Sequence, residues 1–137
     1  MAIVSSGGQD EFFDELEVMP TEVREKYLNQ RLSQAVDYAH RNAPAAREIL
    51  DRAEVSPAEI RTIKDLEKLP ITRKTDLIEL QRAKPPYGGF LAIPFEDVDR
   101  VFISPGPIYE PLHTEAIKWF AKSFYAAGFR KGDVVIN

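Results

Sequence analysis

The chain has 137 residues, of which 44% are hydrophobic and 29% charged, a composition typical of a folded globular protein of single-domain size. Eighteen Lys and Arg residues against 22 Asp and Glu residues give a net charge of −4, so no basic surface is expected to attract nucleic acid or anionic lipid. The chain contains no cysteine, which excludes disulfides, thiolate nucleophiles and cysteine-ligated metals.

The first part of the chain is predicted to consist of a leader followed by a helical segment. Residues 1–12 include the run "SSGG" and predict a flexible leader, without the basic region or the apolar core of a signal peptide. No run in the chain approaches the ~18 apolar residues that a membrane span needs, so we expect a cytoplasmic protein. The helical segment is predicted to span residues 13–82.

A long helix is predicted to begin at Thr21, which follows Pro20 and is a candidate N-cap. Its apolar residues repeat with a period of 3.6: Leu28, Leu32, Ala35, Val36 and Ala39. Asn42 and Pro44 are expected to end the helix, because proline disfavours the helical conformation in the residue before it.

Several short helices are predicted next. Residues 45–53, "AAREILDRA", form the first, and Ser56, Thr62 and Thr72 are candidate N-caps of three more. Asp65 lies three residues after Thr62, which is the spacing of a capping box. The segment is therefore expected to be a layer of small helices.

Residues 83–97 predict a loop, because the adjacent prolines and adjacent glycines of "KPPYGGF" cannot continue a helix. Tyr87, Gly88, Gly89 and Phe90 are compatible with a ligand-binding loop, but a bend of the chain is the favoured interpretation.

Residues 98–137 predict a βαβ unit. The expected parts are a strand at 98–104, a helix at 114–127 with Gly128 as its C-cap, and a second strand at 133–136. The two strands should be parallel with a right-handed crossover. The helix is rich in apolar residues that are expected to form the core: Ile117, Trp119, Phe120, Ala121, Phe124 and Tyr125.

The predicted fold class is therefore α/β, with a helical N-terminal layer and an incomplete first βαβ unit. A parallel sheet of two strands buries almost nothing. We expect either that the chain is the N-terminal portion of a larger protein, or that a second copy covers the open strand edge.

Four stretches of the chain, spread from about residue 13 to residue 137, carry a resemblance to a known family. They are "LEVMPTEVREKYLNQRLSQAVDYAHRNAP", "IRTIKDLEKLPITRKTDL", "PPYGGFLAIPFEDVDRVFIS" and "FAKSFYAAGFRKGDVVIN". In this order they resemble the N-terminal portion of the phenylacetate-CoA ligase group of adenylate-forming enzymes. The resemblance implies the first part of an adenylate-forming N-terminal domain.

The resemblance also places a phosphate loop at "SPGPIYEP". In the family, a Ser-Gly-Thr-Thr-Gly-Lys-Pro pattern at this point wraps the triphosphate of ATP. The corresponding positions are the candidate cofactor-binding residues of this chain: Ser104, Gly106, Pro107, Ile108, Tyr109 and Glu110.

Three of these positions oppose phosphate binding. Pro107 lacks a backbone donor, Tyr109 has a side chain where the family has glycine, and Glu110 has a negative charge where the family has lysine. A proline-stiffened turn is therefore favoured over a modified nucleotide or acyl-substrate loop. His40 and His113 lie near helix ends and are interpreted as structural. No catalytic residue and no metal site is predicted.

The resemblance implies an activity for a full-length parent. That parent would activate a carboxylic acid, aromatic by analogy with the family, with ATP and Mg²⁺, and would transfer the acyl group to CoA. The chain alone is expected to be inactive and to hold no cofactor. The alternatives are a non-catalytic paralogue and a dimerising interaction module. The expected partner is a second copy or a missing C-terminal portion of the same protein.

Overall fold

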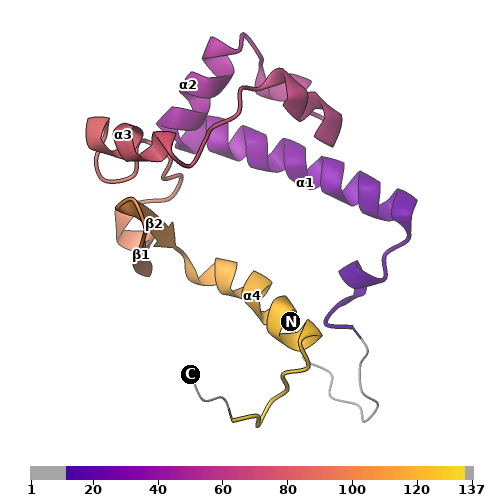
Figure 1. The fold of residues 1–137 in the computed structure, drawn as a ribbon. Coiled ribbons are helices and arrows are strands. Elements are labelled where there is room, and N and C mark those ends of the chain that lie inside the picture. Colours follow the sequence, from indigo (N-terminus) through magenta and orange to yellow (C-terminus); the bar gives the residue numbers. More distant parts are fainter. Residues whose placement is uncertain (1–11, 135–137) are drawn as a thin grey trace.

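A computed structural model describes residues 12–134 (Figure 1). Its α-helices are α1 (Thr21–Asn42), α2 (Pro44–Arg52), α3 (Asp76–Ala83) and α4 (Ile117–Ala126). Its strands are β1 (Arg100–Ser104) and β2 (Ile108–Leu112). The short 3-10 helices are η1 (Glu15–Glu17), η2 (Pro57–Glu59), η3 (Ile63–Lys68), η4 (Phe95–Asp97) and η5 (Thr114–Ala116).

The predicted layer of helices is confirmed, with small shifts of the caps. Pro20 occupies the N-cap position of α1 and Thr21 is the first helical residue. α3 begins after Thr75 rather than Thr72, because a hydrogen bond from the Arg73 N–H to the Asp76 carboxylate holds a turn there. The segments predicted after Ser56 and Thr62 form 3-10 helices, which are common in pieces as short as these.

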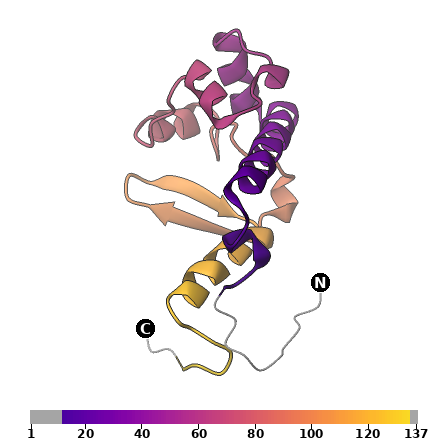
Figure 2. The ribbon, with the colours of Figure 1, turned by 90° about the vertical axis from the view of Figure 1, so that its right-hand side faces the viewer.

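The chain after β1 differs from the prediction. Residues 105–112 were expected to form a loop, but Ile108–Leu112 is a strand that pairs antiparallel with β1, from Arg100 opposite Leu112 to Ser104 opposite Ile108. Gly106 adopts φ +109, which lets the chain reverse between two prolines. The hairpin projects from the helical layer in Figure 2. The predicted strand 133–136 lies mostly outside the described residues, so its parallel pairing stays a prediction.

The buried core is small and is distributed over the helical layer, the loop after α3 and the start of β2. Its apolar residues are Ala43, Ala45, Leu50, Ile60, Tyr87 and Ile108. The long helix α1 contains no buried residue, and Leu28 of its apolar stripe is exposed.

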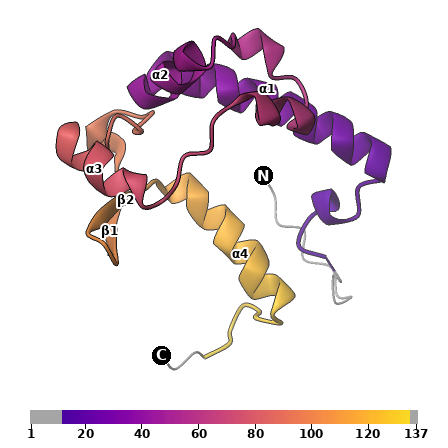
Figure 3. The same ribbon diagram turned by 45° about the horizontal axis from the view of Figure 1, so that its top comes forward.

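The aromatic residues of α4 do not form the core that the sequence predicts. Trp119, Phe120 and Phe124 are 64%, 58% and 56% exposed. The physical reason is the position of α4, which extends from the hairpin on a course separate from α1 (Figures 1 and 3). Phe13 packs edge-on against Tyr125, with 5.5 Å between ring centroids, and Asp14 pairs with Lys122 at 2.6 Å. These contacts hold one side of α4 only.

Candidate functional site

The candidate site is the tip of the β1–β2 hairpin, which packs against α3. Ile108, the first residue of β2, is only 3% exposed. Gly106 lies so close to α3 that a Cβ atom in its place would be 3.3 Å from Cδ1 of Ile78. The apolar contacts of these residues therefore seat the tip of the hairpin on the helix.

Gln81 of α3 fixes the second strand. Its side-chain nitrogen donates to the Tyr109 carbonyl at 2.9 Å, and the Tyr109 N–H donates to its side-chain oxygen, also at 2.9 Å. The Gln81 side chain is buried, so these bonds form away from bulk water. Gln81 is not among the residues predicted from the sequence, although it lies on the apolar stripe of α3, three residues after Ile78.

Lys74, which precedes α3, pairs with Glu110 of β2. The Nζ atom lies 2.8 Å from the Glu110 carboxylate, and both side chains are exposed. The Lys74 ammonium lowers the pKa of Glu110, and the Ser104 hydroxyl lowers it further. The Ser104 oxygen is shielded from solvent, yet it makes no hydrogen bond of regular geometry with the described residues. Glu110 is therefore held in its charged form.

Of the six candidate residues, Ser104 ends β1, Gly106 and Pro107 lie in the turn, and Ile108, Tyr109 and Glu110 begin β2. Pro107 has no N–H, and the N–H of Tyr109 is already bonded to Gln81. Glu110 presents a negative charge. Phosphate is bound by free backbone N–H groups and by cations, and Pro107, Tyr109 and Glu110 supply neither of these.

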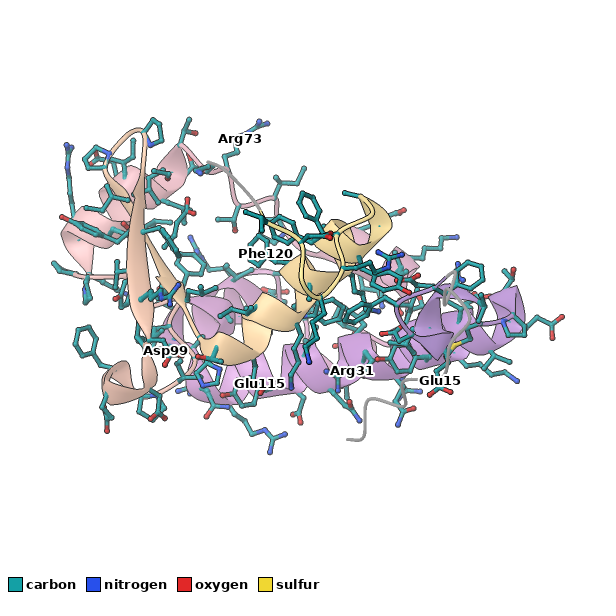
Figure 4. The ribbon with its side chains drawn as sticks, turned by 90° about the horizontal axis from the view of Figure 1, so that it is seen from below. Glu15, Arg31, Arg73, Asp99, Glu115 and Phe120 are labelled. Atoms are coloured by element: carbon teal, nitrogen blue, oxygen red, sulfur yellow. The ribbon has the colours of Figure 1, made fainter. Side chains whose placement is uncertain are left out.

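The other residues that the sequence analysis considered have structural roles. The Nδ1 atom of His113 accepts from the Glu115 N–H at 3.3 Å, which confirms His113 as a capping residue. The Asp99 carboxylate accepts from both the N–H and the hydroxyl of Thr114, which lowers its pKa. Asp99 and Glu115 lie together at the start of α4 in Figure 4.

The "PPYGG" loop is a bend that follows α3 and packs against both α2 and α3, as favoured from the sequence. Tyr87 is buried, and Gly88 and Gly89 adopt φ +66 and +80. The Gly89 carbonyl accepts from Ala45 N–H at 3.0 Å, and a Cβ on Gly88 would touch the Leu80 backbone at 3.2 Å. Glycine is needed at both positions for the positive φ and the close approach.

Residues 12–134 contain neither a candidate metal site nor a helix suited to span a membrane. No group of three or more His, Asp or Glu side chains there is arranged to bind a metal ion. No helix in this part of the chain combines the length and the apolar character that a bilayer crossing requires.

Comparisons with known proteins show which proteins this chain is similar to. No protein-family model matches the chain. The phenylacetate-coenzyme A ligase of Thermus thermophilus is 37% identical over 131 residues, which are 90% of this chain and 28% of that protein. The corresponding ligase of Pseudomonas putida is 32% identical over 130 residues, 89% of this chain and 28% of that protein. The chain is related to the N-terminal portion of the phenylacetate-CoA ligases.

A solved structure gives the same relationship. The 2-hydroxyisobutyryl-CoA ligase in its postadenylation state, in complex with R3-HIB-AMP, matches with a TM-score of 0.85 and 28% identity. The match covers 96% of this chain and 29% of that protein. The described fold is therefore that of an N-terminal portion of an adenylate-forming ligase, and the chain spans less than a third of the length of these relatives.

Proposed function

We propose that the chain forms the N-terminal part of an acid–CoA ligase, whose parent protein activates a carboxylic acid with ATP and transfers the acyl group to CoA. The observation that supports this most strongly is the 37% identity to a phenylacetate-coenzyme A ligase over 90% of the chain. An aromatic acid is the proposed substrate class, because the relatives found by sequence are named for phenylacetate.

Within this proposal, the hairpin does not hold the triphosphate. The Gln81 side chain is hydrogen-bonded to the backbone N–H and carbonyl of Tyr109, and Pro107 has no backbone N–H to donate. Lys74 is already paired with Glu110. The role of this chain in the ligase is then to form the helical layer and to seat the hairpin, while the contacts to ATP come from other parts of the parent.

A second candidate is a paralogue that has kept the fold and lost ATP chemistry. The Lys74–Glu110 pair favours it, because a carboxylate that is held ionised at the hairpin repels a polyphosphate. Such a protein would act as a binding or regulatory module.

A fusion protein distinguishes the two candidates. This chain replaces the matched region of the Thermus thermophilus ligase, and phenylacetyl-CoA formation is measured with ATP, phenylacetate and CoA. We expect the fusion to be slower than the parent ligase by about 10²-fold or more, because donors to a reacting phosphate are worth about that factor each. We expect recovery when residues 104–111 are replaced by the hairpin of the Thermus enzyme.

The outcomes separate cleanly. Recovery supports the ligase, with the substituted hairpin as the cause of the slow rate. A folded fusion that stays inactive with the Thermus hairpin favours the non-catalytic paralogue. Full activity of the unmodified fusion would show that the substituted hairpin does not slow the reaction.

A further inference from the structure

The free side of α4 carries an apolar stripe. Ile117, Phe120 and Phe124 follow one another at offsets of three and four residues and are 42%, 58% and 56% exposed. Contacts with Phe13 and Asp14 occupy a different side of the helix, through Tyr125 and Lys122. Figure 4 places Phe120 and Glu115 on opposite sides of α4. Phe129 packs edge-on against Phe124, with 5.4 Å between ring centroids, and the rest of the stripe is an exposed face of an amphipathic helix.

The hairpin has an uncovered apolar face as well. Ile108 faces α3, and side chains alternate between the two faces of a strand, so Val101, Ile103 and Tyr109 share the opposite face. These three residues are 46%, 64% and 42% exposed. We call them, together with Ile117, Phe120 and Phe124, the apolar surface.

The exposed area of the chain is too large for a compact monomer. The chain exposes 11085 Å², whereas a compact monomer of 15.6 kDa exposes roughly 7,300 Å². Full exposure of the residues outside the described range would account for only about 2,000 Å² of this difference. The remaining excess, roughly 1,800 Å², is about what one side of an obligate interface buries.

We propose that the apolar surface is the docking site for the remainder of an adenylate-forming ligase fold, the portion that the relatives carry outside the matched region. This inference rests on the proposed function. The backbone matches 29% of the 2-hydroxyisobutyryl-CoA ligase at a TM-score of 0.85, so it has the shape of a segment that is continuous with a larger body in that protein. The partner is therefore a ligase body with an apolar face.

The hairpin argues against a second copy as the partner. On the outer edge of β2, the Gln81 side chain is hydrogen-bonded to both the N–H and the carbonyl of Tyr109. Pro111, on the same strand, has no N–H that could donate to another strand. This edge is blocked for pairing with another strand. Two copies would have to associate through the apolar faces alone.

The test compares α4 in two contexts by hydrogen exchange. The isolated chain and its fusion to the remainder of the Thermus thermophilus ligase are measured under the same conditions. We expect the amides of α4 to exchange about tenfold or more slowly in the fusion, because burial of the stripe suppresses local opening. Phe120→Lys in the fusion should abolish this protection. Val23→Lys, at an exposed apolar position of α1, is the matched control and should leave it intact.

Each result supports or overturns the proposal. Equal exchange of α4 in both contexts, a fusion that fails to fold, or equal effects of both lysine variants would overturn it. So would sedimentation of the isolated chain as a stable dimer in which α4 is protected. None of these measurements needs ATP or an acid substrate. A fusion that protects α4 but makes no acyl-CoA even with the Thermus hairpin would therefore contradict the proposed function and leave the docking surface standing.

Discussion

Gln81 replaces a neighbouring strand on the outer edge of β2. A primary amide offers one acceptor and donors in nearly the arrangement of a peptide group, so a single side chain can satisfy both backbone groups of Tyr109. Both hydrogen bonds are partly buried, and water is a poor substitute there. The hairpin is thus attached to α3 by polar bonds as well as by the apolar contact of Ile108.

Substitution of Gln81 should loosen this attachment. We expect Gln81→Ala to lower the free energy of unfolding by about 1–3 kcal/mol, because it leaves the N–H and carbonyl of Tyr109 without their partner. Urea denaturation followed by circular dichroism measures the change. Gln30→Ala, on the exposed part of α1, is the control and should change stability by less than about 0.5 kcal/mol. Equal stability of Gln81→Ala and the unmodified chain would contradict this role.

At the scale of elements, most of the helices could be predicted from local signals in the sequence. The apolar repeat and Pro44 predicted α1 and its end, and the Thr62–Asp65 spacing predicted a helix start that the Thr62 N–H confirms by donating to Asp65 at 2.8 Å. Such signals act within one or two turns of chain and need no tertiary partner.

The second strand could not be predicted in this way. Pro111 lies within it, and proline disfavours a strand interior; it is tolerated here because the strand lies at a sheet edge. Likewise, the exposure of α4 depends on what packs against the helix, and the helical repeat alone does not specify that. The repeat predicted the helix correctly and its environment wrongly.

The candidate site was predicted in part for the same reason. The six hairpin positions follow from a local motif, so the sequence located the turn. Gln81 and Lys74 lie 28 and 36 residues before their partners Tyr109 and Glu110, and only the fold brings them together. The sequence therefore identified the substituted residues, and the structure identified what holds them.

The hairpin as an element should not bind ATP, and reversal of one charge should not restore binding. Glu110→Lys removes the repulsive carboxylate but places a second ammonium beside Lys74, while Pro107 and the occupied Tyr109 N–H remain. We expect calorimetric titration with Mg-ATP to give a dissociation constant in the millimolar range or weaker, on the order of 4 kcal/mol of binding free energy at most, for both chains. Micromolar binding by the unmodified chain would contradict this expectation.

Across the whole molecule, carboxylates pair with lysines, and two of these pairs join separate segments of the chain. Glu48 of α2 pairs with Lys84 after α3, Lys74 joins Glu110 of β2, and Asp65 pairs with Lys68 at 2.9 Å. The side-chain hydrogen bond from the lysine is the main cause that lowers the pKa in all three cases. Pairs that are largely open to solvent contribute little to stability individually, but the three carboxyl pKa values are all shifted downward.

That shared sign predicts how stability depends on pH. Because the carboxylates have lower pKa values in the folded chain than in the unfolded chain, their contribution is complete above about pH 4.5 and is lost as the pH falls toward the folded values. The urea midpoint should therefore stay level from about pH 7 to 5 and decline below that range. Asp65→Asn should lower the midpoint at pH 7 and reduce the decline, because Asp65 also accepts from Thr62 and Arg61. Glu67→Gln, at an exposed position in the same 3-10 helix, is the matched control, and identical pH profiles for the two variants would refute the assignment to Asp65.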